Sequence, residues 1–266
     1  RLVSDWSSDV CSSDLFGHPA KKLKIITITG TKGKTTSTVY LGRLLNSLGL
    51  KTGFISTALH NDGKSEYINP YKNTSIDGFL MHRTIKKMVE NGCEYAVLEM
   101  SSQGLEQNRH LGLGKFDGGL FLNLYPEHIE AHGSFENYRR CKGIMVKNTK
   151  PNGFLIASSA KGQKEHVQYL VETFNPNLRI VDYMDLQGIS EDIENSIYKS
   201  ITFNGDSIPT KIIADFNIEN LAMCIQALQR IKPDLESEKI IQTNKNLDYT
   251  LPGRMEFAVE IGEVKN

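Results

Sequence analysis

The sequence predicts an α/β protein in which a mostly parallel sheet is covered by helices on both faces. Short runs of apolar and β-branched residues alternate with longer stretches of helical periodicity. This is the pattern of strands joined by crossover helices. A glycine-rich turn joins the first such strand to the first helix, and this connection is typical of α/β proteins that bind ligands at the carboxyl ends of their strands.

The predicted strands are short apolar runs bounded by turns or by helical stretches. They cover residues 24–29, 52–57, 95–100, 118–123, 153–157, 178–181, 200–203 and 210–213. The segment 187–213 is less regular than the rest. Strands separated by helices pair in parallel, so most of these runs are expected to share one sheet.

The predicted helices cover residues 34–48, 76–91, 134–148, 161–174, 218–231 and 236–242. Gly49 is expected to stop the first of them, because glycine adopts the backbone conformation that ends a helix without strain. Ser75 is expected to cap the start of the second helix, and Asn217 is expected to cap the helix after residues 215–216.

Composition narrows the class of partner. The chain has 31 basic and 31 acidic residues, so no overall field draws it to nucleic acid or to an anionic membrane. No apolar run approaches the roughly 20 residues of a spanning helix. A cytoplasmic, monomeric protein with a metabolite-sized ligand is expected. The four cysteines are widely scattered and are expected to be reduced, structural thiols.

Residues 1–15 differ in kind from the rest of the chain. Ser7-Ser8-Asp9-Val10 and Ser12-Ser13-Asp14-Leu15 nearly repeat each other around Cys11, without helical or strand periodicity. Two interpretations stay open, a non-native translated linker and a disordered native tail. Either interpretation leaves this segment out of the predicted fold.

The strongest local signal is the run from Thr29 to Thr36 between the first strand and the first helix. Glycines let several backbone N–H groups and the helix dipole point at one phosphate. The cradle would use Gly30, Thr31, Lys32, Gly33, Lys34, Thr35 and Thr36. Lys34 would add a cation, and Thr35 a hydroxyl for Mg²⁺. The standard P-loop spacing would need glycine at position 28, which is Ile28, and a plain glycine-rich turn is the alternative.

Three further residues could bind a metal or take part in catalysis, but each also has an ordinary structural interpretation. Glu99 closes an apolar run, which places its carboxylate at the carboxyl edge of the sheet, but a solvated charge is the ordinary interpretation. His128 follows another strand, where a structural histidine is more common than a metal ligand. Lys142 lies in a helix, where a lysine is ordinarily a solvated charge.

Several spaced motifs, taken in order, resemble the Mur ligase family, and most closely its tripeptide-forming branch. The loop Gly-Thr-Lys-Gly-Lys-Thr-Thr resembles the family's Gly-Thr-Asn-Gly-Lys-Thr. The other matches are Phe16 to Pro19, Asn73 to Ser75, Glu99 to Gln103, Gln107 to Arg109, Asn123 to His128, His132-Gly133, Tyr138 to Lys142, Asn217 to Asn220 and Leu251 to Glu256. The resemblance spans about residues 16–260.

The resemblance implies an ATP-dependent ligase that forms an amide bond in peptidoglycan precursor synthesis. A carboxylate of UDP-MurNAc-dipeptide would be activated as an acyl phosphate and attacked by an amino acid amine. The implied cofactors are ATP and two Mg²⁺ ions. Glu99, His128 and Thr35 would be metal ligands, and so would Lys142 after carboxylation of its Nζ by CO₂. Lys34, Lys142 and His128 would be the catalytic residues.

The resemblance also implies the binding residues. Thr74, Ser75, Ser101 and Arg109 match positions for the UDP-sugar peptide, since hydroxyls and a guanidinium suit phosphate and carboxylate groups. The ATP-side positions are Asn217, Asn220 and Arg254, together with the loop. The family pattern is broken at Lys32, Ile76, Gln103 and Glu127.

The resemblance divides the chain into four segments. After the tail 1–15, residues 16–23 would be the end of a linker from an N-terminal UDP-binding domain and 24–250 the central ATP-binding domain. Residues 251–266 would be a linker and the start of a C-terminal domain that selects the amino acid. The 266 residues alone are therefore expected to bind Mg·ATP weakly and to form no amide. A relative with another substrate (folylpolyglutamate, cyanophycin or an amidated lipid) and a non-catalytic nucleotide-binding module are the alternatives.

Overall fold

The computed structural model describes residues 12–71, 73–158, 162–182, 189–192, 198–203, 206–210 and 214–253. Its centre is an eight-stranded sheet with the order β4-β3-β2-β5-β1-β6-β7-β8. Its strands are β1 (Lys24–Thr29), β2 (Thr52–Ile55), β3 (Leu59–Asn61), β4 (Glu66–Ile68), β5 (Tyr95–Glu99), β6 (Phe116–Phe121), β7 (Thr149–Ala157) and β8 (Arg179–Asp182). The strands β2, β5, β1, β6, β7 and β8 run parallel, which confirms the predicted fold class.

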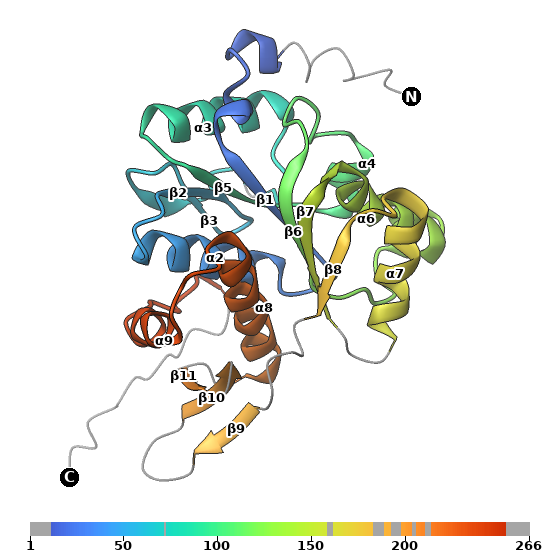
Figure 1. The fold of residues 1–266 in the computed structure, drawn as a ribbon. Helices are drawn as coiled ribbons and strands as arrows, with labels where there is room; N and C mark the ends of the chain where they lie inside the picture. Colours follow the sequence, from blue (N-terminus) through green and yellow to red (C-terminus); the bar gives the residue numbers. More distant parts are fainter. Residues whose placement is uncertain are drawn as a thin grey trace, which may run out of the picture.

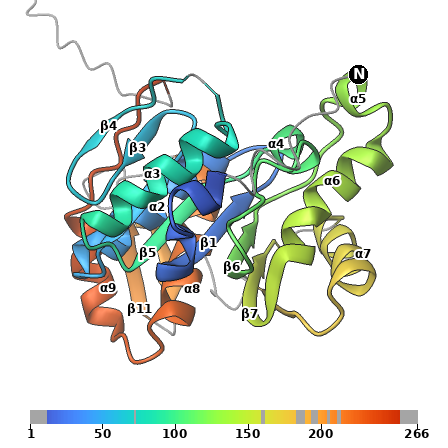
Figure 2. The same cartoon turned by 90° about the horizontal axis from the view of Figure 1, so that it is seen from above.

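Helices cover both faces of this sheet (Figures 1 and 2). One layer holds α2 (Lys34–Ser47), α8 (Asp215–Ile231) and α9 (Ser237–Lys245). The other holds α3 (Gly78–Glu90), α4 (Ser102–Glu106), α6 (Phe135–Asn148) and α7 (Gln163–Phe174). Two shorter elements are η1 (Pro19–Lys22) and α5 (Ile129–His132).

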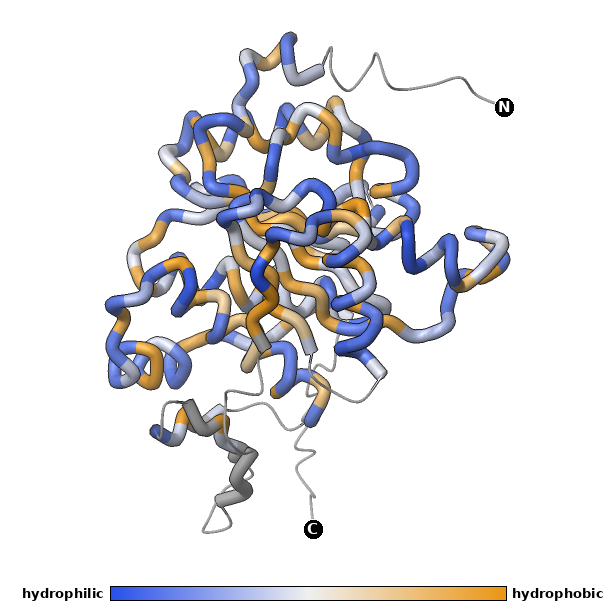
Figure 3. The backbone as a smooth tube through the Cα atoms, turned by 45° about the vertical axis from the view of Figure 1, so that its right-hand side comes forward, coloured by the Kyte–Doolittle hydropathy of each residue, from blue (hydrophilic) through white to orange (hydrophobic). Residues whose placement is uncertain are grey.

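Alternation along the strands supplies both apolar layers. Ile26 and Ile28 belong to the core under α2 and α8, and Ile25 belongs to the core under α3 and α6. All three are at most 1% exposed. Successive strand residues point to opposite faces, so a strand that is apolar at every position is buried on both sides. Figure 3 shows the apolar segments concentrated in the central strands.

A second, three-stranded sheet lies below the main one in Figure 1. It is antiparallel and consists of β9 (Ile189–Asp192), β10 (Tyr198–Phe203) and β11 (Asp206–Thr210). The sequence predicted strands at 200–203 and 210–213. Strand β11 already begins at Asp206, which pairs with Phe203 of β10, and residues 211–213 of the second predicted strand lie outside the described residues.

Two expected helix caps are wrong. The Asp77 carboxylate, not Ser75, accepts the N–H of Leu80 at 3.0 Å and starts α3, because the Ser75 hydroxyl lies 3.0 Å from that of Ser101. Ala214, not Asn217, is the N-cap of α8. The hairpin β3–β4 and the short helices were not predicted, since three- to five-residue elements carry too little periodicity.

Residues 1–11 lie outside the described part of the chain. Residues 12–15 are helical, and the Ser13 hydroxyl donates to the Gly112 carbonyl at 3.2 Å. The four-part division of the chain stays a prediction. None of the described helices is both long and apolar enough to cross a bilayer.

Candidate active site

The candidate site lies where the central parallel strands end. Strand β1 has β5 and β6 as neighbours, and the chain leaves β1 through the loop that starts α2. In register, Glu99 at the end of β5 stands beside Ile28, and Phe121 of β6 stands beside Thr29. All these carboxyl ends meet at one edge, so residues distant in sequence converge there.

The glycine-rich loop has the conformation that a phosphate cradle needs. Gly33 is the N-cap residue of α2 with φ 83°, a left-handed backbone that glycine adopts without strain. A Cβ at Gly33 would lie 2.4 Å from Oδ1 of Asn220 in α8. The missing side chain at Gly33 leaves room for Asn220 beside the N-terminus of α2, and both residues line the cavity.

Asn123 holds the loop from the neighbouring strand. Its Oδ1 accepts the N–H groups of Thr31 at 3.0 Å and Lys32 at 2.9 Å. The Thr31 hydroxyl lies 3.0 Å from the hydroxyl of Tyr138, and the Lys34 ammonium donates to the Thr31 carbonyl at 2.9 Å. The loop is thus fixed before any ligand arrives.

Glu99 is the centre of a buried polar cluster. It is 2% exposed, and its carboxylate accepts the Thr35 hydroxyl at 3.1 Å and the Thr57 N–H at 2.7 Å. Burial raises the pKa of Glu99, while the Lys34 charge and the bonds from Thr57 and Thr35 oppose this rise. A buried carboxylate beside a threonine hydroxyl offers hard oxygen ligands of the kind that Mg²⁺ prefers.

Lys142 reaches the same loop from α6. It is 1% exposed, and its Nζ donates to the Gly30 carbonyl at 2.7 Å. Burial and the nearby Lys34 charge lower the pKa of Lys142 well below its usual value. The expectation of an ordinary solvated lysine is therefore wrong for this residue.

Two cavities meet at this cluster. The larger, of about 820 Å³, is lined by the loop together with Thr57, Glu99, Asn123, Phe216, Asn217 and Asn220. The smaller, of about 270 Å³, is lined by Ser75, Ser101, Gln103, Arg109, His128, Tyr138 and Lys142. Lys34 and Thr74 line both. The loop, Asn217 and Asn220 thus line the larger cavity, and Ser75, Ser101 and Arg109 line the smaller one, with Lys34 and Thr74 between them.

The substrate-side residues also bind one another. The Arg109 guanidinium donates to the Ser75 carbonyl, and the Ser101 hydroxyl caps α4 by accepting the Gly104 N–H at 3.0 Å. His128 has a left-handed backbone with φ 56° and starts α5. Its ring lies 6.1 Å from that of Tyr138.

Two residues that break the family pattern face each other at the rim. The Lys32 ammonium lies 3.4 Å from the Glu127 carboxylate. A further departure, Ile76, is 1% exposed and packs in the apolar core. Arg254 lies outside the described residues.

Sequence reasoning assigned no role to Thr57 or Phe216. Thr57 binds both carboxylate oxygens of Glu99, yet a threonine after a strand gives no signal of its own. Phe216 is 58% exposed and lines the larger cavity. In the sequence, the available signal for Phe216 was an aromatic residue at the start of an apolar helix.

Fold and site together define a nucleotide-binding α/β protein of the P-loop type. Residues 28–228 match the Mur ligase middle domain. The chain belongs to the Mur ligase family, whose members use ATP and Mg²⁺. This confirms the resemblance on which the sequence interpretation rests.

Curated relatives extend the match over most of the chain. A UDP-N-acetylmuramoyl-L-alanyl-D-glutamate–2,6-diaminopimelate ligase of Clostridium tetani is 30% identical over 251 residues, covering 93% of this chain and 50% of the relative. A UDP-N-acetylmuramyl-tripeptide synthetase of Borreliella afzelii is 30% identical over 266 residues, covering 95% and 50%. The chain spans about half the length of these relatives.

Solved structures share the fold at low identity. The apo form of L. casei FPGS superposes with a TM-score of 0.74 at 13% identity, covering 96% of this chain and 70% of that one. A UDP-N-acetylmuramoyl-L-alanyl-D-glutamate–2,6-diaminopimelate ligase superposes with a TM-score of 0.65 at 18% identity, covering 85% and 46%.

Proposed function

We propose that this chain is the nucleotide-binding part of an ATP-dependent amide ligase of peptidoglycan precursor synthesis, with UDP-MurNAc-dipeptide and an amino acid as substrates. The observation that carries the proposal is the junction of two cavities at Lys34 and Thr74. A kinase-like phosphoryl transfer to a carboxylate needs ATP on one side of a cation and the acceptor on the other. The named relatives supply the substrate class.

The proposed reaction has two steps. The substrate carboxylate attacks the γ-phosphorus, the bond to the ADP oxygen breaks, and an acyl phosphate forms. The amino acid amine then attacks the carbonyl carbon, phosphate leaves with the C–O bond electrons, and the amine loses a proton. Lys34 and the N–H groups of the loop stabilise charge on the transferred group. Arg109, Thr74, Ser75 and Ser101 hold the UDP-linked peptide.

Magnesium fits the residues present. Glu99 and Thr35 provide hard oxygen ligands beside the larger cavity, and a cation there would offset the cost of burying the Glu99 charge. When bound, the metal neutralises charge on the β- and γ-phosphates. His128 and Lys142 line the smaller cavity, and with Lys142 carboxylated they are the proposed ligands of a second ion.

The chemistry of Lys142 supports its carboxylation. A lowered pKa leaves more of the amine neutral, and only the neutral amine attacks CO₂. The N–C bond then forms, and one amine proton leaves to solvent. In ¹³C NMR with labelled bicarbonate we expect a carbamate signal from the full-length protein that is absent in Lys142→Arg. The same signal in both proteins would remove this assignment.

Ligation by the full-length protein tests the function. Mg·ATP and UDP-MurNAc-dipeptide should release phosphate only with the correct amino acid, and mass spectrometry should detect the tripeptide. Release with a folate or lipid-linked acceptor instead would favour another branch of the family, and nucleotide binding without any product would favour a non-catalytic module. A cytoplasmic, monomeric enzyme stays a prediction from the sequence.

A further inference from the structure

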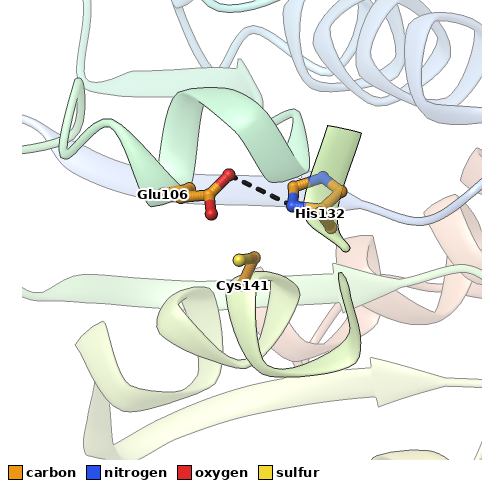
Figure 4. Close-up of side chains that lie close together, drawn as sticks. All are labelled: Glu106, His132 and Cys141. Carbon is orange, nitrogen blue, oxygen red and sulfur yellow. Dashed lines mark ion pairs between the residues drawn. The ribbon is translucent and has the colours of Figure 1, made fainter. Parts of the chain in front are cut away.

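Glu106, His132 and Cys141 form a cluster beside the site that the proposed reaction does not use (Figure 4). One ligand atom from each residue lies within 4.8 Å of the other two. Glu106 ends α4, His132 ends α5, and Cys141 lies in the second turn of α6. Three separate elements therefore aim a carboxylate, an imidazole and a thiol at one point.

The histidine ring is held in one orientation. Its Nε2 lies 3.0 Å from the Ser102 hydroxyl, which fixes the side of the ring that faces α4. Its Nδ1 lies 3.1 Å from the Glu106 carboxylate. Figure 4 shows this nitrogen on the side of the ring that faces Glu106 and Cys141.

The contact between Nδ1 and Glu106, dashed in Figure 4 as an ion pair, lacks the alignment of a hydrogen bond. The side chain of His132 is 0% exposed, and within the described part of the chain no hydrogen-bond partner meets Nδ1. Depending on the tautomer, Nδ1 carries either an N–H or a lone pair, and both point outward from the ring along the same direction. Because that direction passes beside the carboxylate oxygen, Nδ1 is not aligned with Glu106 in either tautomer. A buried nitrogen in this position is costly unless another atom occupies the space between the three groups.

A catalytic triad does not fit this arrangement. A triad uses one ring nitrogen for the nucleophile and the other for the carboxylate, whereas here Ser102 takes Nε2 and the carboxylate meets Nδ1. A shared cation needs the opposite layout, with all three groups around one point. Nitrogen, sulfur and oxygen ligands together select zinc and its neighbours over Mg²⁺.

We propose that Glu106, His132 and Cys141 bind a divalent transition-metal ion of the zinc class, through one carboxylate oxygen, Nδ1 and Sγ, with water as the fourth ligand. Binding releases the thiol proton to solvent. Ser102 is the outer partner that orients the histidine, as metal-binding histidines usually require. The side chain of Glu106 is 41% exposed, which gives the ion a path from solvent.

The location of this metal site gives it a structural consequence. Cys141 precedes Lys142, and α4 begins next to Ser101. An ion at the cluster ties together α4, α5 and α6. Ser101 and His128 start α4 and α5, and Lys142 lies within α6, and all three line the smaller cavity. The ion would hold these elements at fixed separation while lying outside the cavity itself.

Cobalt titration of the full-length, tag-free, metal-stripped protein tests the proposal. Excess Mg²⁺ is kept present to occupy the nucleotide site. We expect one equivalent of Co²⁺ to bind with a thiolate-to-cobalt charge-transfer band, and Zn²⁺ to displace it. Cys141→Ser should lose the band, and Glu106→Gln should bind Co²⁺ at least about tenfold more weakly.

Two controls locate the signal. Cys93→Ser removes another buried free thiol and should keep the band, and so should Glu99→Gln at the nucleotide site. A wild-type protein without the band, or a Cys141→Ser protein that keeps it, would overturn the proposal. If Cys141→Ser fails to fold, the partly exposed Glu106 decides, and unchanged cobalt affinity in Glu106→Gln would equally overturn it. None of these measurements depends on ligase activity.

Discussion

At the scale of single residues, burial changes what a side chain can do. Glu99, His128 and Lys142 looked ordinary in the sequence, but the structure places Glu99 and Lys142 in a buried cluster around the loop. Water no longer screens their charges there, so each interacts strongly with Lys34. Burial beside Lys34, more than residue type, makes Glu99 and Lys142 candidates for a role in catalysis.

Lys34→Ala should weaken binding of Mg·ATP by about 10- to 100-fold in calorimetric titration. A charge-assisted hydrogen bond to phosphate contributes roughly 1.5–3 kcal/mol, and this bond is lost. Lys32→Ala is the matched control, because the Lys32 side chain is 72% exposed and pairs with Glu127 at the rim. Equal losses in both variants would mean that only overall charge matters.

Phe216→Ala should weaken Mg·ATP binding about fivefold or more. The exposed ring lines the larger cavity, and stacking of a base on an aromatic ring contributes roughly 1–3 kcal/mol. Phe79→Ala is the control, since Phe79 is 45% exposed on α3, away from this cavity. Nucleotide affinity that is unaffected by Phe216→Ala would place the base elsewhere.

At the scale of elements, the site depends on how helices begin. The proposed phosphate-binding loop has Gly33 at the start of α2, and the proposed substrate side has Ser101 at the start of α4. Two glycines allow a clean measurement of the role of Gly33. Gly33 and Gly49 have nearly the same φ, 83° and 79°, but only Gly33 has a neighbour within 4 Å of the added Cβ.

Gly33→Ala should lower the free energy of unfolding by more than Gly49→Ala does. Each pays roughly 1–2 kcal/mol for a left-handed residue with a Cβ, and Gly33→Ala also collides with Asn220 of α8. Urea denaturation of both variants gives the difference directly. Equal losses would show that α8 moves aside without cost.

Asp77→Ala should cost about 1 kcal/mol of stability, because α3 loses the cap on the Leu80 N–H. Hydrogen exchange of the Leu80 amide should speed up. Ser75→Ala should leave that amide protected, since Ser75 contacts Ser101 instead. The opposite pattern would restore the cap predicted from the sequence.

At the scale of the whole molecule, buried histidines set the response to acid. Burial lowers the pKa of His60 and of His110 from 6.5 to about 4. Between these values the unfolded chain binds protons that the folded chain does not. Above pH 6.5 both histidines are neutral in the folded and in the unfolded chain, so their burial does not make the free energy of unfolding depend on pH. As the pH drops from 6.5 towards 4, the unfolded chain gains protons and the free energy of unfolding falls.

Urea denaturation between pH 7 and pH 5 should reveal this slope. His60→Leu should reduce the slope by up to about 1.4 kcal/mol per pH unit, the value for one proton. Leu41→Val, a buried change without a titratable group, should lower stability at every pH and keep the slope. A slope unaffected by His60→Leu would mean that this histidine is not neutral in the folded protein.

The sequence by itself determined the alternating order of strands and helices, the parallel sheet, the position of the glycine-rich loop and the family. Each of these features can be recognised from a short, continuous stretch of sequence, because strands buried on both faces are apolar at every position and the loop is one continuous segment. Glu99 and Lys142 could be singled out only through resemblance, since neither has a local pattern that differs from a surface charge.

Only the tertiary structure decided which distant residues meet. Thr57 and Glu99 come from the ends of neighbouring strands, and Asn123 reaches the loop from a third. Glu106, His132 and Cys141 come from three helices. Such contacts arise from sheet order and helix packing, which bring together positions that are far apart in the chain. The short elements around the site were equally decided by packing, because three to five residues hold too little periodicity to specify a structure alone.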